Sequence, residues 1–316
     1  MSAREINELR DPEVLRGVLD SLQIGVYVVD RERRIVLWNA GAEKITGYMR
    51  HDVVGRVSRE NILANCNDGS CILCGAVCPL TEVIHEGHPR EAQIYLRHKA
   101  GHRVPVHLRV VPVRDQRGLI VGAAQSFEEQ GPIAELGIRP GNLAAHGCLD
   151  LPTGVPNHAF TQSHLRENLN FFNEYHLPFG VLLIRVNDLQ QLRASHGREA
   201  VDVMLHVVAQ TMKHTLRPDG FLGRWAEDSF LAIVTNGNRS DLERAAVSVE
   251  KIVGCSGIQW WDDLLSVTVS VGQTMVQSGD TLEVLVERAE RSLPQPETKS
   301  SAAAAGGETP PQGPGN

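Results

Sequence analysis

The octapeptide Gly223-Arg224-Trp225-Ala226-Glu227-Asp228-Ser229-Phe230 is the most informative segment in the C-terminal half of this chain. Apolar, strand-like segments flank it at 220–225 and 230–235, and a four-residue turn, 226–229, separates them. This pattern is typical of a β-hairpin, in which polar residues collect in the turn and apolar residues pair in the strands. The sequence therefore predicts the carboxylates of Glu227 and Asp228 at the tip of a turn.

Two further motifs lie on either side of this hairpin. Residues 150–158 read Asp-Leu-Pro-Thr-Gly-Val-Pro-Asn-His, and residues 267–272 read Val-Thr-Val-Ser-Val-Gly. Together with the octapeptide they resemble the GGDEF family of diguanylate cyclases, which has an Asp-x-Leu-Thr-Gly-Leu-x-Asn-Arg motif and an Arg-Tyr-Gly-Gly-Asp-Glu-Phe hairpin. The resemblance covers about residues 148–293 and implies an α/β nucleotide-cyclase-like domain.

The resemblance also indicates which positions carry the chemistry. The family joins two GTP molecules, each held by one subunit of a dimer, and uses Mg²⁺ to neutralise the phosphates. Hard divalent cations need carboxylate oxygens. The two aspartate positions at the end of the first core strand are Arg185 and Asn187 here, and the hairpin glutamate is Ser229. We therefore expect two-metal chemistry to be lost.

Positions that hold the phosphates and the base depart from the family as well. Ala226 and Glu227 replace two glycines, which let backbone N–H groups approach a phosphate. Asp202 matches the guanine-binding aspartate, but Arg193 stands in place of its asparagine partner. We expect a domain that keeps the cyclase fold without catalysis, in which Glu227, Asp228 and Asp202 are ordinary solvated residues.

Two alternatives stay open for this domain. One is an active diguanylate cyclase that makes cyclic di-GMP from GTP, with Mg²⁺ as cofactor and Glu227 or Asp228 as substitute ligands. The other is a domain that binds GTP without turnover.

The N-terminal half resembles a PAS sensor domain over about residues 14–128. The match is closest at 24–47, where a Gly-Val-Tyr-Val-Val-Asp strand is followed by Trp38-Asn39-Ala40, and later segments at 101–106 and 118–122 fall in the right order. The resemblance implies an antiparallel sheet with short helices, so the whole chain is expected to be α+β. PAS domains can hold haem or flavin, so a haem ligand among His85, His88, His98, His102 and His107 stays open as an alternative to ordinary polar surface, whereas no flavin-reactive cysteine motif is recognisable.

Four cysteines lie within thirteen residues of this half, at Cys66, Cys71, Cys74 and Cys78. Four thiolates can complete a tetrahedral Zn²⁺ site or ligate an iron–sulfur cluster. The segment 66–78 therefore predicts a metal site and a metal- or redox-binding regulator, with a thiol redox switch and inert buried thiols as alternatives. Cys148 and Cys255 stand apart and are expected to pack in the fold.

Local patterns predict the remaining organisation. Helices are expected at 4–22, 40–45, 79–86, 188–216, 239–253 and 281–292. Strands are expected at 25–29, 34–38, 90–98, 102–114, 119–128, 179–186, 220–225, 230–235, 258–261 and 265–272. Residues 1–13 belong to the first helix, residues 129–147 read as a linker broken by proline and glycine, and the Pro, Gly, Ser and Ala-rich tail at 294–316 reads as disordered.

Composition limits the partners and the compartment. The 316 residues carry a formal net charge of −7, which gives no electrostatic reason to expect nucleic acid or an anionic membrane as a partner. No signal peptide or membrane-length apolar run is present, so we expect a cytoplasmic protein with reduced thiols. The family resemblance implies a homodimer, and an inactive cyclase-like domain would act through a protein partner.

Overall fold

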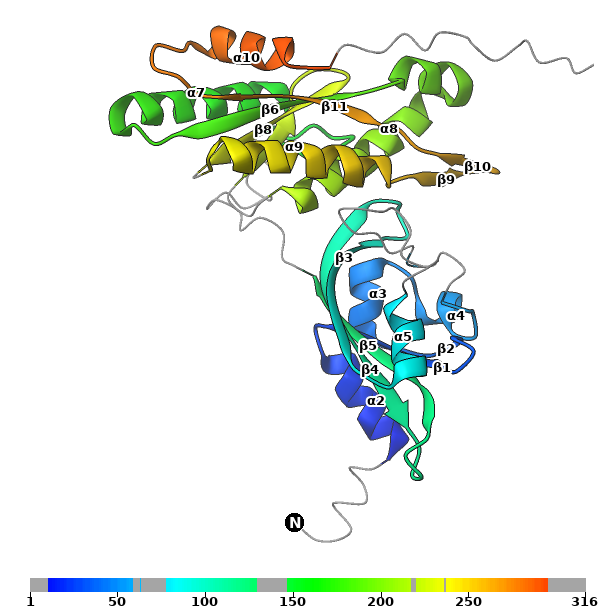
Figure 1. The fold of residues 1–316 in the computed structure, drawn as a ribbon. Coiled ribbons are helices and arrows are strands. Elements are labelled where there is room, and N and C mark those ends of the chain that lie inside the picture. Colours follow the sequence, from blue (N-terminus) through cyan, green and yellow to red (C-terminus); the bar gives the residue numbers. More distant parts are fainter. Residues whose placement is uncertain are drawn as a thin grey trace, which may run out of the picture.

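The structure is a computed structural model that describes residues 11–58, 63, 78–129, 147–216, 220–235 and 237–294. The described residues form two domains, each with its own sheet and its own core (Figure 1). The α+β fold class expected from the sequence is confirmed. The expectations for residues 1–10, for most of the linker and for the tail from 295 lie outside the described residues.

The N-terminal domain is a five-stranded antiparallel sheet with short helices on it. Its strand order is β2-β1-β5-β4-β3. The strands are β1 (Gly25–Asp30), β2 (Ile35–Trp38), β3 (Arg90–Arg97), β4 (Arg103–Arg114) and β5 (Ile120–Glu129). The helices are α2 (Pro12–Ser21), α3 (Ala40–Thr46), α4 (Arg50–Val53) and α5 (Pro79–Glu86).

Aromatic side chains fill the interior of this domain. The rings of Tyr27 and Trp38 have centroids 5.3 Å apart, and Phe127 lies 6.2 Å from Tyr27. All three residues are buried, and the hydroxyl of Tyr27 donates to Oε1 of Gln125 over 3.1 Å. These three side chains therefore pack against each other as part of the apolar core of the N-terminal domain.

The C-terminal domain is a four-stranded antiparallel sheet covered by helices on both faces. Its strand order is β11-β6-β8-β7, with a separate β9–β10 hairpin beside it. The strands are β6 (Phe179–Val186), β7 (Phe221–Arg224), β8 (Ser229–Thr235), β9 (Ile258–Trp260), β10 (Asp263–Leu265) and β11 (Val269–Met275). The helices are α7 (His158–Tyr175), α8 (Leu189–Thr215), α9 (Arg239–Gly254) and α10 (Leu282–Arg291).

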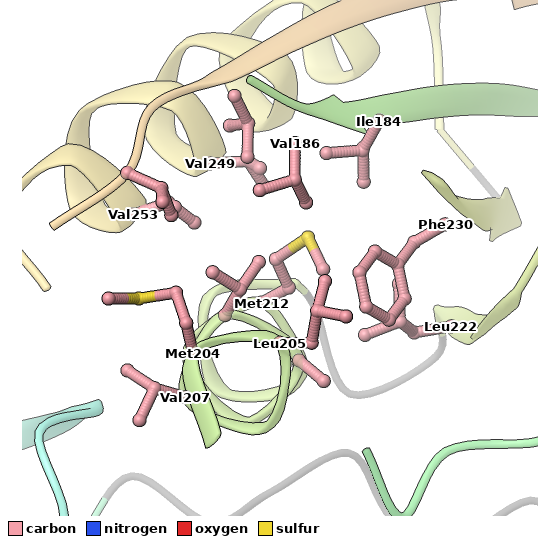
Figure 2. Packing of buried hydrophobic residues seen from close by; sticks show 14 of the residues in the cluster. Ile184, Val186, Met204, Leu205, Val207, Met212, Leu222, Phe230, Val249 and Val253 are labelled. Carbon is pink, nitrogen blue, oxygen red and sulfur yellow. The ribbon is translucent and has the colours of Figure 1, made fainter. Parts of the chain in front are cut away.

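Alternation along the central strand builds two separate cores in this domain. Leu182, Ile184 and Val186 point to one face, where they pack with residues of α8 and α9 such as Met204 and Val249 (Figure 2). The other face of the sheet packs against α7 and α10 in a second cluster. Because the side-chain period of a strand is two, Arg185 lies on the second face, at the end of β6.

The structure differs from the sequence expectations at three helices. The helix expected at 4–22 is interrupted at Asp11, which has extended backbone angles and accepts the N–H of Glu13 as the N-cap of α2, whereas residues 4–10 lie outside the described residues. The sequence reading missed α7, which Asn157 caps. Helix α8 was expected to be continuous but is broken at Gly197, whose φ of 81° lies in the left-handed region.

The strand expected at 265–272 was also wrong in its extent. Its first residue, Leu265, ends β10, which pairs with β9, whereas β11 begins at Val269 and pairs with β6. The chain therefore changes partner between 265 and 269, so one apolar run serves two different sheets.

Candidate functional site

The hairpin predicted by the octapeptide is present, and its turn is hydrogen-bonded across its base. The carbonyl oxygen of Ser229 accepts the N–H groups of Trp225 and Ala226 over 2.9 and 3.1 Å. Ser229 is the first residue of β8 and is buried, whereas at the tip Glu227 is exposed and Asp228 is half-buried. The interpretation of these two carboxylates as turn residues fits this geometry.

The motif at 150–158 supports one strand of this hairpin. The N–H of Arg224 donates to the carbonyl of Pro156 over 2.7 Å, and Nδ1 of His158 lies 2.6 Å from the carbonyl oxygen of Trp225. The motif is itself a tight turn, because Gly154 has φ +70° and donates its N–H to the carbonyl of Asp150 over 2.8 Å. Two of the three motifs that carry the family resemblance are therefore in direct contact.

Arg185 occupies the centre of the candidate site. In the sheet register it lies directly opposite Ser229 on β8 and directly opposite Ser270 on β11. Side chains that pair in this way lie on one face, with Cβ atoms about 5 Å apart. The Nε atom of Arg185 is 3.9 Å from a carboxylate oxygen of Asp228. A cation flanked by two hydroxyls thus occupies the place where the family resemblance implies metal ligands.

A second arginine neutralises the other carboxylate of the turn. Arg193, from the first part of α8, forms an ion pair with Glu227, and this hydrogen bond lowers the pKa of Glu227. Arg224 also donates to the backbone carbonyl of Glu227, and its guanidinium lies 4.7 Å from the centre of the Phe230 ring. Each acidic residue of the turn is therefore paired with a cation of this chain.

The remaining predicted site residues lie near the hairpin but have other partners. Asn187 donates its amide to the hydroxyl of Thr268 over 3.0 Å and accepts from Ser270 over 3.2 Å, so it ties β6 to β11. Asp202 lies on α8, 3.8 Å from Nε of Arg198 one turn earlier. Asp202 is therefore a half-buried helix residue with a local ion pair.

This arrangement of donor groups does not fit a hard divalent cation. Arg185 and Ser229 supply a guanidinium and a hydroxyl where two carboxylates would be needed. Within the part of the chain that the structure describes, no group of three His, Cys, Asp or Glu side chains is placed to hold a metal ion. We therefore derive no catalytic step through Mg²⁺.

Three cysteines of the four-cysteine segment, Cys66, Cys71 and Cys74, lie outside the described residues. Cys78 is a free, buried thiol at the N-cap of α5 and belongs to the apolar core of the N-terminal domain. Cys148 is half-buried. Cys255 takes part in a disulfide bond, so the expectation that it only packs in the fold was wrong.

Sequence reasoning gave no sign of the contacts made by Arg193 and Arg224. Arg193 is 34 residues from Glu227, and no local sequence pattern predicts such a pair.

Among the described helices, none is long and apolar enough to cross a membrane.

Comparison with protein families matches both halves of the chain. The family described as "Diguanylate cyclase, GGDEF domain" matches residues 148–301, and the family described as "PAS fold" matches residues 13–126. The probable diguanylate cyclase DgcE of Escherichia coli K12 is 23% identical over 283 residues, which cover 88% of this chain and 25% of DgcE. The diguanylate cyclase DgcP of Pseudomonas aeruginosa is 26% identical over 148 residues, covering 45% of this chain and 21% of DgcP.

Solved structures resemble this chain over about half of its length. The diguanylate cyclase SiaD of P. aeruginosa, crystallised with its activator SiaC, is 27% identical with a TM-score of 0.46 and covers 48% of this chain and 59% of SiaD. The GGDEF domain of FimX from P. aeruginosa is 19% identical with a TM-score of 0.44, covering 46% of this chain and 90% of that domain. The chain spans only about a quarter of the length of DgcE and DgcP.

Proposed function

This chain carries a PAS domain followed by a GGDEF domain, and we propose that it is a signal-transduction protein whose GGDEF domain does not cyclise GTP. In this proposal the PAS domain is the sensor and the GGDEF domain is an output module that acts by binding. The observation that carries the proposal is the position of Arg185, opposite both Ser229 and Ser270.

The electrostatics of the site support this proposal. Mg²⁺ bound beside Arg185 would be repelled by the guanidinium, and the carboxylates that remain are already paired with arginines. Glu227 also adds a negative charge where the family has a glycine against the phosphates. Catalysis of phosphoryl transfer depends on positioning the phosphates and neutralising their charge, and these substitutions weaken both.

A turnover assay tests the proposal. The purified full chain is incubated with GTP and either Mg²⁺ or Mn²⁺, and we expect no cyclic di-GMP. Robust formation of cyclic di-GMP would overturn the proposal in favour of an active cyclase. Binding of a fluorescent GTP analogue, measured in parallel, separates a domain that holds the nucleotide from one that does not.

A restoration experiment identifies the cause. The double variant Arg185→Asp/Ser229→Glu returns two carboxylates to adjacent strands, and we expect it to gain Mn²⁺ binding that the parent chain lacks. The matched control Arg185→Ala/Ser229→Ala removes the cation without adding ligands and should not bind. If the restored variant binds Mn²⁺ without turnover, Ala226→Gly and Glu227→Gly are added to reopen the turn.

A homodimer is the second part of the proposal. Helix α2 and its C-cap residue expose four apolar side chains at helical spacing: Val14, Leu15, Val18 and, at the C-cap, Leu22. Exposed apolar stripes of this kind are typical of contact surfaces. We expect light scattering to give a dimeric mass, and we expect Leu15→Glu with Val18→Glu to give a monomer. A monomeric parent chain would contradict this part. We also propose that the GGDEF domain binds a protein partner.

The sensory input is proposed to involve the four-cysteine segment, which is supported by its sequence alone. The test is metal analysis and an absorption spectrum after anaerobic purification, compared with Cys71→Ser/Cys74→Ser. Absence of a metal and of any difference between the two proteins would leave inert thiols as the interpretation.

A further inference from the structure

The PAS and GGDEF domains touch through a contact that includes a buried arginine. The turn between β3 and β4 faces the GGDEF domain near α8 and the end of α9 (Figure 1). Arg103, only 4% exposed, donates from Nε and Nη2 to the carbonyl oxygen of Cys255 over 3.0 and 2.5 Å. Its backbone N–H donates to the hydroxyl of Thr211 on α8 over 3.2 Å. Hydrogen bonds from a buried cation are stronger than neutral ones, so Arg103 anchors the contact.

The backbones of the two domains also approach closely beside Arg103. Gly101 has φ +99°, and a Cβ there would lie 2.4 Å from the carbonyl oxygen of Gly257. Arg97 donates to the same carbonyl over 3.3 Å. Only a residue without a side chain fits here, so the contact has one closely fitting geometry.

Three histidine rings stack across this contact. His98 and His102 come from the PAS turn, with ring centroids 4.2 Å apart and an interplanar angle of 22°. His214 comes from α8, and its ring is 5.9 Å from His102 at 6°. The Nδ1 atoms of His102 and His214 are buried with no hydrogen-bond partner, whereas Nδ1 of His98 accepts the N–H of Ala100 over 3.0 Å. The acceptor at His98 identifies its ring as unprotonated on Nδ1.

The surroundings disfavour a charge on the central ring. Burial, together with the neighbouring His98, His214 and His206, lowers the pKa of His102 to about 3. Burial also lowers the pKa of His98.

The ring from α8 has mixed surroundings. Burial and the nearby Lys213 lower the pKa of His214 to about 4. The carboxylate of Glu129 on β5, 3.5 Å from Nδ1 of His214, opposes this, although burial raises the pKa of Glu129 and Lys44 lowers it. His102 is therefore the ring whose neutrality the contact requires most strictly.

We propose that the His98–His102–His214 stack makes this domain contact proton-sensitive, docked while the rings are neutral and released when they are protonated. A proton on any one ring would place a charge in a desolvated stack and repel a second proton on its neighbour. Separation of the domains would expose His102 and His214 to water, where each can carry its charge.

The direction and size of the effect follow from linkage. A histidine with a lowered pKa in the docked state holds fewer protons there than in the undocked state. Docking is therefore strongest above pH 6.5, the ordinary histidine pKa, and weakens as the pH falls toward 3. Within this window each pH unit lowers the docked-to-undocked ratio about tenfold per histidine. Between pH 7.5 and 5.5 the ratio should fall about tenfold for His102 alone.

Energy transfer within the full chain tests this inference. Fluorescent unnatural amino acids replace Arg117, in the β4–β5 turn, and Arg239, at the start of α9, and transfer is recorded from pH 7.5 to 5.0 at constant ionic strength. Circular dichroism at each pH reports whether both domains stay folded. We expect transfer to fall in the parent chain as the pH drops, and we expect His102→Phe, which keeps a flat ring that cannot be protonated, to show a smaller fall at pH 5.5, because only His98 and His214 of the stack can still take up a proton.

Three further variants define the readout. His88→Phe changes an exposed histidine of the same domain and should follow the parent chain. Arg103→Ala should show the undocked value already at pH 7.5, and Thr211→Val serves the same purpose if Arg103→Ala does not fold. The inference is wrong if the parent chain shows no change while an undocked reference differs, or if His102→Phe responds to pH as the parent does. Because the readout is a distance, the outcome is independent of whether the GGDEF domain turns over GTP.

Discussion

Arginine side chains serve two regions of this molecule in different ways. At the GGDEF hairpin, Arg185 and Arg193 meet Asp228 and Glu227 with side chains that are 47% and 49% exposed. At the domain contact, Arg103 is 4% exposed and donates to a backbone carbonyl. At the hairpin, arginines pair with carboxylates in contact with water. At the domain contact, the buried guanidinium of Arg103 donates hydrogen bonds to a backbone carbonyl.

The exposure of an arginine side chain indicates whether it mainly affects the stability of the fold or the binding properties of a site. Exposed ion pairs contribute about 0 to 1 kcal/mol, because water screens them and the side chains lose freedom. A buried cation that loses its place leaves acceptors unpaired, which costs more. The hairpin arginines are therefore expected to determine what can bind there, whereas Arg103 determines how the two domains are held together.

The sharpest test of this contrast is Arg103→Ala. We expect the free energy of unfolding to fall by about 3 kcal/mol, because two charged hydrogen bonds are lost and the Cys255 carbonyl loses these donors. Urea denaturation followed by tryptophan fluorescence measures it. The matched control is Arg109→Ala on the same strand, an exposed residue 3.3 Å from Glu91, which should cost less than about 1 kcal/mol. Equal losses for the two variants would break the comparison.

A smaller effect is expected from Gly101→Ala. The added Cβ meets the Gly257 carbonyl and is strained at φ +99°, so we expect a loss of about 2 kcal/mol. Gly118→Ala is the control, because Gly118 has φ +81° with nothing within 4 Å of its Cβ. The control carries the backbone strain without the clash, so the difference in urea midpoint isolates the close fit between domains. Equal urea midpoints for the two variants would mean that the backbone at Gly257 can shift to accommodate the added Cβ.

Asn157→Ala tests the N-cap of helix α7, next to the turn that contacts the hairpin. Asn157 accepts the N–H of Phe160 over 3.0 Å as the N-cap of α7 and donates to the carbonyl of Gly147 over 2.9 Å. Losing the cap should cost about 1 kcal/mol in thermal or urea unfolding. Asn157→Asp keeps the acceptor and loses the donor, so it should recover most of the loss. An equal loss in both variants would assign the effect to Gly147 instead.

The smallest effect is expected from Arg193→Ala. Its partner Glu227 is exposed, so we expect a change in stability below about 0.5 kcal/mol, diminishing further at high salt. Arg198→Ala, at a side chain that is 84% exposed, provides the baseline. A loss above 1 kcal/mol for Arg193→Ala alone would show that the hairpin ion pair is structural, and the contrast with Arg103 would fail.

Sequence patterns predicted the sheets of this protein better than its helices. The strand at 179–186 and the helix at 79–86 were found with the same bounds because their apolar residues sit between clear breaks. Helix α7 was missed although Asn157 is a good N-cap and Thr161, Leu165 and Leu169 repeat every four residues. Its many Asn, His and Phe residues have weak helix propensity, which hid the pattern.

The site was predicted in its positions and not in its contacts. The family motifs located Arg185, Asn187 and Ser229, because aligned motifs carry position. The pairing of Arg193 with Glu227 depends on how α8 meets the turn, and the meeting of Arg103 with Cys255 joins residues 152 apart in different domains. Neither contact has a local signature, so only the folded chain brings these residues together.

The break in α8 at Gly197 has a mechanical consequence. Residues 189–196, which carry Arg193, form a short piece joined to the long buried remainder of the helix by one left-handed glycine. A continuous helix transmits a rotation at one end along its whole length, whereas a helix interrupted at one residue absorbs it there. Residues 189–196 can therefore move relative to the hairpin without a matching rotation of the helix at Thr211 and His214. A movement at one end of α8 need not be transmitted to the other end.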